Sequence, residues 1–585
     1  MRADRAVAAA RIVAALVALA AVPLVVGDFW AYQLGLFYLY AIAALGLGVC
    51  WGRAGFLPLG QGLFFGLAAY LSGLALIAFE QRPAWLLVLL PLAACASGAL
   101  AFAIGVLVFR RRGESGPYFS MITLALALLA YQLANNWESV TGGFNGLKGI
   151  PGLPGLDSYS AAYAVAAIAL VGATLLVAWL YRAPLGVLWA ALAHNERRVV
   201  MFGFDTNRLK AVAFGASGLL AGIGGVLYAP QQGLVTPQLV GFALSADLVI
   251  WAAVGGRARL LGPALGAIAI GVLASELRDR LPYWEIALAI LFIAVVLFFP
   301  EGLAGAFAPL TRRRRRSAGA GSGTAHVAAP ARAEHDDAAR LEIEDIEVRV
   351  GDVTILDRLA LVLDRPAIYC FIGPNGAGKT STFDVLTGEL PVRSGTVRFA
   401  GRALERLPAH RIVRLGIGRK FQIPSVFPQL SIADNLAIAV WSARARPLEL
   451  LRPRLRRWST PLLDALRERY PFLADASRTA AALSHGERQI LELSMALVGE
   501  PRVLLLDEPC AGLSPHETAA VIDAIRWASA QRRATIVVIE HDMALVRTLA
   551  DHVFVLHNGR VLAEGSVATV QADRAVQAIY VGAAK

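Results

Sequence analysis

The sequence predicts two domains of different fold class: an α-helical polytopic membrane domain of about ten transmembrane helices, followed by an α/β domain with a phosphate-binding loop. The distribution of charge predicts the division. Residues 1–310 hold 31 charged side chains, or about 10%, and residues 311–585 hold 67, or about 24%, where soluble proteins average about 25%. A chain of 585 residues that is 57% hydrophobic is also too long for a single soluble core. We therefore predict a membrane domain at 1–310, a linker at 311–340 and an α/β domain at 341–585.

The membrane domain is predicted from apolar segments long enough to cross a bilayer, which requires about 20 residues. A long apolar core and the segments that follow favour a span over a signal peptide for the first of them. The predicted spans are 8–27, 31–50, 56–79, 84–109, 117–136, 159–181, 211–230, 241–256, 260–275 and 284–300.

The orientation follows from the positive-inside rule. With a cytoplasmic N-terminus and ten crossings, fourteen basic residues fall in inner loops and four in outer loops, namely Arg82, Lys148, Arg278 and Arg280. Ten crossings return the chain to the cytoplasm before the basic run Arg312–Arg316, so the second domain is expected on the cytoplasmic side. The net charge of +12 is thus explained by membrane orientation, and we expect no nucleic-acid partner. The four scattered cysteines predict buried thiols without disulfides.

Some features of the membrane domain leave two interpretations open. Asp247 and Glu285 are the acidic residues nearest to apolar spans, and each is either a functional group at membrane depth or an interfacial residue. Glycine pairs with small-xxx-small spacing indicate either ordinary close packing or helices broken around a translocation path. These pairs are Gly62/Gly66, Gly218/Gly222 and Gly262/Gly266.

The polar segment 182–210 between two spans is either a solvated loop or a coupling helix that docks on the second domain, and we favour the coupling helix. Residues 317–339 are rich in Gly, Ala and Ser without a hydrophobic period, which predicts a flexible tether.

The second domain opens with alternating short β-rich and helical runs, typical of an α/β fold. Within AIYCFIGPNGAGKTSTFDVL, a strand, a Gly-rich turn and a helix follow one another, and the turn is a complete G-x-x-x-x-G-K-[ST] motif. Its backbone amides and the helix N-terminus can hold phosphates, its lysine can reach the β- and γ-phosphates, and its threonine can bind Mg²⁺. The predicted ATP-binding residues are Gly373, Pro374, Asn375, Gly376, Ala377, Gly378, Lys379, Thr380 and Ser381.

A second apolar strand, VLLLDEP, ends in Asp507 and Glu508. Both carboxylates are expected at the carboxyl end of the strand, near the phosphates. Asp507 suits a Mg²⁺ ligand and Glu508 suits a general base that orients water.

The motifs between and after these strands resemble those of ABC-transporter ATPases in order and spacing. LSHGERQ resembles the signature of that family, GIGRKFQ its Q-loop, AGLSP its D-loop and IEHD its switch histidine. The resemblance implies an ATP-hydrolysing, head-to-tail ATPase dimer, in which the signature of one subunit closes over ATP held by the other. It implies catalytic roles for Gln422 and His541 beside Glu508, and Mg²⁺ ligation by Thr380, Gln422 and Asp507. The implied signature residues are Ser484, His485, Gly486 and Glu487.

The sequence departs from the family pattern at two positions. His485 stands where the broad family has Gly, a variation of its amino-acid-importer branch. Val350 stands where an aromatic residue normally stacks on adenine, so we expect weaker adenine stacking and reduced selectivity for ATP.

The membrane domain resembles permeases of the branched-chain amino-acid importer family through GQGLFFGLAAY, GPYFSMITLALA, TGGFNGLKGIP, AGIGGVLYAP and LLGPALGA. The resemblance implies a permease fused to its ATP-binding subunit in a cytoplasmic (inner) membrane, with the ATPase on the cytoplasmic side. The implied cofactors are ATP and Mg²⁺. The implied partners are a second permease and a second ATPase, or a homodimer in their place, an extracytoplasmic solute-binding protein, membrane lipid and a small solute.

The substrate class is open between two branches of this family. GIGRKFQIPSVF, VLHNGRVLAEGS and APQQGLVTP resemble the urea-transporting branch, whereas GPYFSMITLALA and TGGFNGLKGIP resemble the amino-acid branch. Branched-chain amino acids rank first, and urea or a short amide is the alternative. An exporter or a non-transport membrane ATPase is a more distant alternative, since exporters usually have about six long helices.

Overall fold

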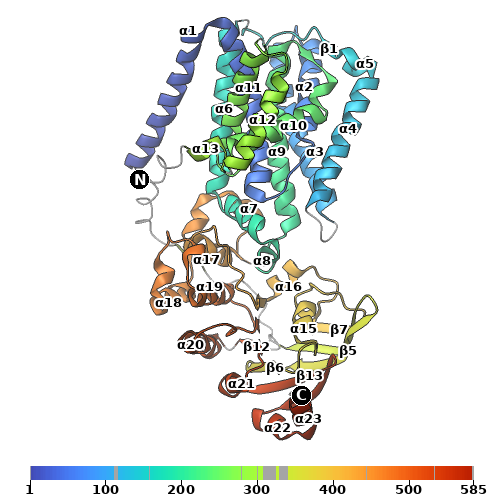
Figure 1. Cartoon of the computed structure of the whole chain (residues 1–585), viewed down its shortest axis with the longest axis vertical. Coiled ribbons are helices and arrows are strands. Elements are labelled where there is room, and N and C mark those ends of the chain that lie inside the picture. The colour runs from blue at the N-terminus through green and yellow to red at the C-terminus, as the bar shows by residue number, and fades with distance from the viewer. Residues whose placement is uncertain are drawn as a thin grey trace. The chain divides into compact units, whose positions relative to one another are not determined.

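The computed structural model describes residues 2–582 except 111–115, 157, 279, 300, 307–324, 328–339, 443 and 533. They form two compact units (Figure 1). The helical unit comprises Met1–Ala193 and Asn207–Ala318, and the α/β unit comprises His194–Thr206 and Gly319–Lys585. Most of the predicted linker, including Arg312–Arg316, lies outside the described residues.

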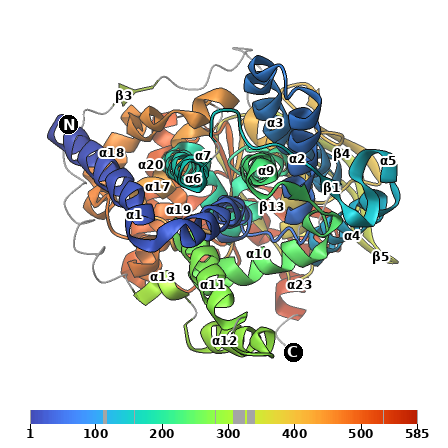
Figure 2. The same cartoon turned by 90° about the horizontal axis from the view of Figure 1, so that it is seen from above.

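The helical unit is built from apolar helices, because in a bilayer every backbone polar group must be satisfied inside its own segment. Figure 2 looks along this bundle, so that α6 and α9 are seen nearly end-on. The main helices are α1 Arg2–Leu47, α2 Gln61–Ala78, α3 Leu86–Phe109, α4 Pro117–Asn136, α6 Tyr159–Arg182, α7 Pro184–His194, α9 Thr206–Gln232, α10 Phe242–Gly255, α11 Gly262–Arg278 and α12 Trp284–Phe298. Shorter elements are α5 Glu138–Thr141, α13 Leu303–Ala306, and the strands β1 Leu147–Lys148 and β2 Leu234–Val235, which pair antiparallel.

The structure does not confirm the predicted number of membrane crossings. Each of the ten predicted spans contains a helix, but six described segments are long and apolar enough to cross a membrane. The helices α10, α11 and α12 have 14, 17 and 15 residues. At 1.5 Å per residue they reach about 21–26 Å, short of the ~30 Å hydrocarbon core. The count of about ten crossings is therefore not confirmed, and the chain is a multi-pass membrane protein with six membrane-competent segments.

The first two predicted spans lie in α1, which consists of two helical stretches joined by a kink at Gly27. Gly27 interrupts α1 with φ 78°, ψ 171°, a conformation that glycine adopts without steric cost. The same chain continues as a π-helical turn, Gly48–Ala54. Gly52 in this turn lies so close to the carbonyl of Arg257 that an added Cβ would be 1.8 Å from that oxygen.

The glycine pairs allow close approach between segments of the helical unit. A Cβ on Gly62 would lie 2.8 Å from the carbonyl oxygen of Gly241, and one on Gly66 would lie 2.6 Å from Val240. Gly218 and Gly222 are packed in the same way against α3, with added Cβ atoms 2.4 Å from Ala101 and 2.9 Å from the Ala94 carbonyl oxygen.

The prediction for the cysteines was wrong at one position. All four are free, but Cys95 on α3 is exposed, whereas Cys50, Cys370 and Cys510 are buried. A thiol on the outer face of a membrane helix is surrounded by apolar groups, so its exposure costs little free energy. The expectation that cysteines are buried comes from soluble proteins and does not hold there.

The α/β unit contains a six-stranded sheet in the order β14-β13-β6-β12-β11-β9, parallel except for β14 at its edge. A second, antiparallel sheet has the order β5-β4-β7-β8. The strands are β4 Leu341–Val350, β5 Val353–Leu363, β6 Ile368–Ile372, β7 Ser394–Phe399, β8 Arg402–Ala403, β9 Ile417–Lys420, β11 Val503–Asp507, β12 Thr535–Ile539, β13 His552–His557 and β14 Arg560–Gly565. Two further short strands, β3 Ala325–His326 and β10 Trp458–Ser459, pair with each other.

Helices connect and cover these strands, as the alternation of strands and helices predicts. They are α8 Glu196–Val200, α15 Lys379–Leu386, α16 Ala409–Leu415, α17 Ile432–Trp441, α18 Pro461–Arg469, α19 His485–Val498, α20 Pro515–Arg532, α21 Met543–Leu549, α22 Val567–Ala572 and α23 Arg574–Gly582. The strands β6, β11 and β12 are buried at every residue, which explains their continuous apolar sequences. Because β6, β12, β11 and β9 are parallel, the loops that follow them gather at one edge of the sheet.

Candidate nucleotide site

The phosphate-binding loop connects β6 to α15, as the motif predicts (Figure 1). Gly373, Gly376 and Gly378 have φ of 145°, 82° and 97°, a region open to glycine and strained for other residues. A Cβ on Gly373 would lie 2.1 Å from the carbonyl oxygen of Leu556. The loop therefore requires glycine, and it directs backbone amides and the N-terminus of α15 toward one point.

The side chain of Lys379 folds back onto the phosphate-binding loop. Its Nζ donates hydrogen bonds to the carbonyl oxygens of Gly373 at 2.7 Å and Pro374 at 3.0 Å. Burial lowers the pKa of Lys379, and the carboxylates of Glu508 and Asp507 oppose that shift. The Lys379 ammonium is therefore influenced by the carboxylates of Asp507, the last residue of β11, and of Glu508, which follows it.

The two acids at the end of β11 differ in environment. Asp507 is the last residue of the strand and is 3% exposed; burial raises its pKa, while the Arg419 guanidinium, 3.8 Å away, opposes the shift. Glu508 follows with φ 42°, a strained conformation for a residue with a side chain, of the kind that clusters at functional sites. The burial of Asp507 suits a side chain that binds a metal ion. The strained backbone of Glu508 fixes the direction of its side chain.

The structure brings together Gln422, His541 and Glu508, the three residues to which the family resemblance gives catalytic roles. Gln422 follows β9, and its Nε2 donates to Oε2 of Glu508 at 2.8 Å. His541 follows β12, and its Nδ1 lies 3.7 Å from Oε1 of Glu508. Both carboxylate oxygens are therefore engaged by side chains from neighbouring strands. The neighbouring Glu540 is a residue that the sequence analysis missed: it is 2% exposed, and burial raises its pKa to about 7.

The signature residues form a separate structure at the start of α19. Ser484 caps the helix, with its Oγ accepting from the Glu487 amide at 3.1 Å, and Glu487 accepts from the Ser484 amide at 2.8 Å. Glu487 also pairs with Arg478 at 2.8 Å, and Gly486 donates to Glu517. Among the described residues, no hydrogen bond joins this segment to the phosphate-binding loop of the same chain. Ser484 is exposed and available to a second copy.

Val350 lies at the end of β4 in the turn of the β4–β5 hairpin, with 53% of its surface exposed. Its partner across the hairpin, Val353, is 67% exposed. The two paired positions of this hairpin therefore carry exposed aliphatic side chains.

Residues 194–206, which we call the coupling segment, belong to the α/β unit although they are inserted between helices of the other unit. Met201 packs in an apolar cluster with Val413 and Phe421. The Nε of Arg414 donates to the carbonyl oxygen of Gly203 at 2.7 Å. The coupling segment therefore docks on the α/β unit beside β9 and α16.

Two neighbouring arginines of the coupling segment make contrasting contacts. Arg197 is 54% exposed and pairs with Glu389 and Asp384. Arg198 is 1% exposed, donates to the carbonyl oxygen of Arg419 at 2.7 Å and lies 3.4 Å from Glu492. Burial lowers the pKa of Arg198, while Glu492 opposes the shift.

Glu492 is itself buried in the middle of α19, with Lys420 on its other side at 4.0 Å. Arg198, Glu492 and Lys420 thus form a buried ionic triad. The triad joins the coupling segment to the helix that begins with the signature and to the strand that precedes Gln422. The sequence analysis did not detect it; its one signal is an acid inside the apolar run ILELSMALV.

Arg419 links the same region to the nucleotide site. Its guanidinium is 1% exposed and contacts Asp384 at 2.6 Å, Glu389 at 2.8 Å and Asp507 at 3.8 Å. Because Asp384 and Glu389 also bind Arg197, two carboxylates are shared between the coupling segment and the arginine beside Asp507. This residue too was missed, since its partners lie far away in the sequence.

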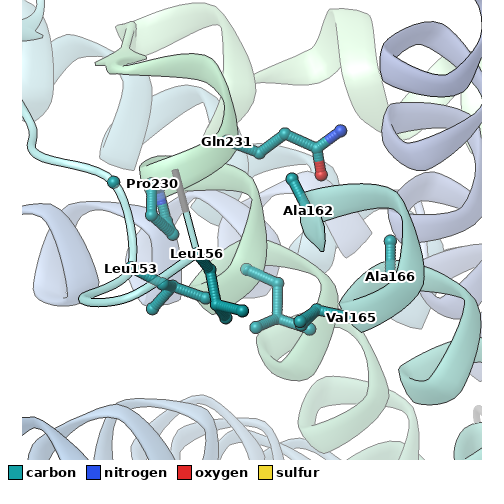
Figure 3. A pocket seen from close by; sticks show the side chains of 9 residues that line it. Leu153, Leu156, Ala162, Val165, Ala166, Pro230 and Gln231 are labelled. Carbon is teal, nitrogen blue, oxygen red and sulfur yellow. The ribbon is translucent and has the colours of Figure 1, made fainter. Parts of the chain in front are cut away.

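The helical unit contains a small apolar pocket between α6, the end of α9 and the segment 152–156 (Figure 3). Its volume is about 40 Å³, room for one or two water molecules. Its walls include Leu153, Leu156, Ala162, Val165 and Pro230. Gln231 also lines it, and the Nε2 of this residue donates to the carbonyl oxygen of Tyr32 at 3.1 Å.

A phosphate-binding loop and a carboxylate held by side chains from two adjacent strands define a P-loop ATPase. Joined to a multi-pass helical unit, it defines an ATP-hydrolysing membrane transporter. Residues 30–299 match the family model described as branched-chain amino acid transport system / permease component, and residues 356–511 match the ABC transporter model.

Curated relatives match the ATP-binding part. The chain is 34% identical over 250 residues to the high-affinity branched-chain amino acid transport ATP-binding protein LivG of Salmonella typhimurium, covering 42% of this chain and 98% of that protein. LivG of Escherichia coli matches with the same identity and coverage, and BraF of Pseudomonas aeruginosa is 32% identical over 252 residues, with 42% and 98% covered. The chain belongs to the ABC transporter family of branched-chain amino acid transport systems, with a permease component and an ATP-binding component in one polypeptide.

Proposed function

We propose that the chain is the fused permease and ATP-binding subunit of an importer that moves branched-chain amino acids into the cytoplasm. The observation that carries the proposal is the combination of a permease of this family with an ATP-binding domain whose relatives are named for branched-chain amino acid transport. The localisation that follows is a cytoplasmic (inner) membrane with the ATPase on the cytoplasmic side.

In the proposed reaction, Glu508 is the general base that orients and deprotonates the attacking water. The hydrogen bond from Gln422 and the contact with His541 hold the carboxylate in place for that role. Lys379 and the loop amides of Gly373–Ser381 hold the β- and γ-phosphates.

Mg²⁺ fits the oxygen donors gathered here, because it prefers carboxylate and hydroxyl oxygens together with phosphate oxygens. Thr380, Asp507 and the amide oxygen of Gln422 are the groups that would hold it. When bound, it would neutralise charge on the β- and γ-phosphates. The buried position of Asp507 supports this assignment, because a buried carboxylate whose ion-pair partner, Arg419, lies 3.8 Å away gains from a closer cation.

We further propose that two chains, or this chain with a second permease and a second ATPase, close head to tail over two ATP molecules. The signature residues Ser484, His485, Gly486 and Glu487 would then contact the nucleotide of the other subunit. This arrangement accounts for the exposed Ser484 at the start of a well-capped helix. Closure would move the coupling segment and change the side to which the permease opens, while an extracytoplasmic binding protein delivers the solute.

Uptake of labelled leucine and labelled urea tests this function. Cells lacking the native chain would be complemented with wild type, Glu508→Gln or Lys379→Ala. We expect leucine uptake with wild type and none with either variant. Urea uptake alone would move the chain to the urea-transporting alternative, and uptake of neither solute would remove the substrate assignment.

The hairpin position Val350 yields a separate prediction. We expect Val350→Tyr to lower the KM for ATP severalfold, because a ring at this exposed position adds stacking of about 1 kcal/mol. The KM for ATP and GTP would be measured in steady-state hydrolysis, with Val353→Tyr as the matched control on the facing strand. An unchanged KM in Val350→Tyr would show that adenine is not held at this hairpin.

A further inference from the structure

A segment between α17 and α18 of the α/β unit is rich in arginine. Residues 444–457, which we call the basic segment, contain six arginines and one acid, so that their formal charge is +5. The chain forms two short 3₁₀ turns here, Pro447–Leu451 and Pro453–Arg457. Neither the nucleotide site nor the docking of the coupling segment uses this charge.

Buried side chains hold the basic segment in place. Leu450 and Leu455 are 8% and 4% exposed, and the indole Nε1 of Trp441 donates to the carbonyl oxygen of Leu455 at 2.9 Å. At the start of the segment, Arg444 pairs with Glu500 at 3.0 Å, with both side chains buried. These contacts fix the backbone, so the fold decides which of the remaining side chains face outward.

Three arginines of the basic segment face outward without an acidic partner. Arg446, Arg452 and Arg454 are exposed, and none of them forms an ion pair with another of the residues that the structure describes. Arg456 differs, because it pairs with Asp434. The single acid of the segment, Glu449, accepts a hydrogen bond from the backbone amide of Arg446 at 2.8 Å. The charge of the three outward arginines is therefore available to an anion from outside the chain.

An apolar side chain is exposed among these arginines. Leu448, two residues after Arg446 and four before Arg452, is 78% exposed. Arginines beside an exposed leucine are typical of surfaces that lie at the boundary between lipid headgroups and acyl chains. In that place the guanidinium groups meet phosphates while the leucine leaves water.

A strand pair joins the basic segment to the linker from the membrane domain. The strand β10, which directly follows the segment, pairs parallel with β3, and the amide of Val327 after β3 donates to the carbonyl oxygen of Ser459 at 3.0 Å. The first residue of β3, Ala325, lies nine positions after Arg316, the end of the basic run that follows the last predicted span. Nine residues of chain span at most about 32 Å. The covalent chain therefore limits how far the basic segment can lie from the end of the membrane domain.

Anionic lipid headgroups match these features together. Guanidinium groups bind phosphate oxygens with two parallel hydrogen bonds. Clusters of four to eight basic residues beside a membrane domain bind anionic lipids, and each basic residue strengthens association by a factor of about five. A soluble acidic partner would match the charge, but it would explain neither the exposed leucine nor the link to the membrane domain.

We propose that the basic segment is a binding site for the phosphate headgroups of anionic lipids, at the surface of the membrane that holds the helical unit. Arg446, Arg452 and Arg454 bind the phosphates, and Leu448 enters the headgroup region. The site goes beyond the proposed import function and does not depend on the identity of the solute.

Hydrogen exchange of the full-length chain in lipid nanodiscs tests this site. One set of discs contains phosphatidylcholine alone, and the other contains phosphatidylcholine and phosphatidylglycerol in a three-to-one ratio. We expect backbone amides of the basic segment to exchange severalfold more slowly in the anionic discs. High salt should remove the difference, because it screens exposed charges.

Two triple variants assign the effect to the named arginines. A chain with Arg446→Gln, Arg452→Gln and Arg454→Gln should show the same slow or fast exchange in both kinds of disc. A matched control changes three exposed arginines elsewhere on the α/β unit and should keep the wild-type difference; its substitutions are Arg365→Gln, Arg398→Gln and Arg402→Gln. Both variants should unfold in detergent at nearly the wild-type temperature, since exposed substitutions have small effects on stability.

Three results would overturn the proposal. Equal exchange of the wild-type segment in the two kinds of disc would show that it does not meet anionic lipid. A difference that persists in the first triple variant would assign the lipid contact to other basic residues. Slower exchange that needs ATP and is the same in both kinds of disc would place the segment at an interface between ATPase units. None of these results would change the proposed import function, which labelled uptake tests separately.

Discussion

Glu508→Gln is expected to bind ATP with near-normal affinity and to hydrolyse it about 10²–10⁴-fold more slowly than wild type, since a general base contributes about that factor. The amide keeps the size of the side chain and can still accept a hydrogen bond from Gln422, but it cannot take a proton from water. Phosphate release under saturating ATP measures the rate, and retention of labelled ATP measures binding.

Glu468→Gln is the matched control for this variant. Glu468 is an exposed glutamate on α18, so its amide form should hydrolyse ATP at the wild-type rate. If Glu508→Gln hydrolysed ATP as fast as this control, Glu508 would not be the base. The buried Glu540 would then be the next residue to test, because its raised pKa makes it a competent proton acceptor near neutral pH.

Arg198→Ala is expected to destabilise the α/β unit and to abolish uptake while leaving basal ATP hydrolysis measurable. Removing one partner from a buried ion pair typically costs about 3–5 kcal/mol. Lys420 remains 4.0 Å from Glu492 and offsets part of the charge, so we expect the low end of that range. Thermal unfolding reports the stability, and uptake per ATP hydrolysed reports the coupling.

Arg197→Ala provides the comparison for Arg198, since the two arginines are adjacent on α8 and differ in burial. The ion pairs of Arg197 are half exposed, and such pairs contribute about 0–1 kcal/mol. This variant should therefore unfold at nearly the wild-type temperature. Equal loss of stability in the two variants, or normal uptake by Arg198→Ala, would contradict the role of the buried triad.

The sequence predicted the nucleotide site more completely than the rest of the molecule, for a physical reason. The phosphate-binding loop is a local structure, in which glycine spacing fixes both the turn and the start of α15. The clustering of Gln422, Glu508 and His541 follows from parallel strands, because residues after each carboxyl end must meet at one edge. Their roles in catalysis remain predictions.

The membrane crossings and the buried triad were harder to predict. Hydropathy finds apolar segments but does not show where α10 begins relative to its neighbours, because that position is set by tertiary contacts such as the hydrogen bond from the Gly62 amide to Ser245. From the sequence, Arg198 is recognised only as a basic residue of an inner loop. Nothing in its local sequence indicates an ion pair with Glu492, which lies 294 positions later. Such pairs depend on tertiary packing alone.

The docking of residues 194–206 on the α/β unit changes what the covalent fusion contributes. The polypeptide enters the α/β unit twice, first through this excursion and again through the stretch at 311–340, and the first entry carries a buried ionic triad and an apolar cluster. The second connection then acts mainly by raising the effective concentration of the α/β unit near the helical unit. The contacts of residues 194–206 supply the specificity of their association. We therefore expect that a chain divided within 311–340 into two separate polypeptides still assembles when both are highly expressed. The fused and divided forms would then differ in the concentration needed for assembly and not in architecture.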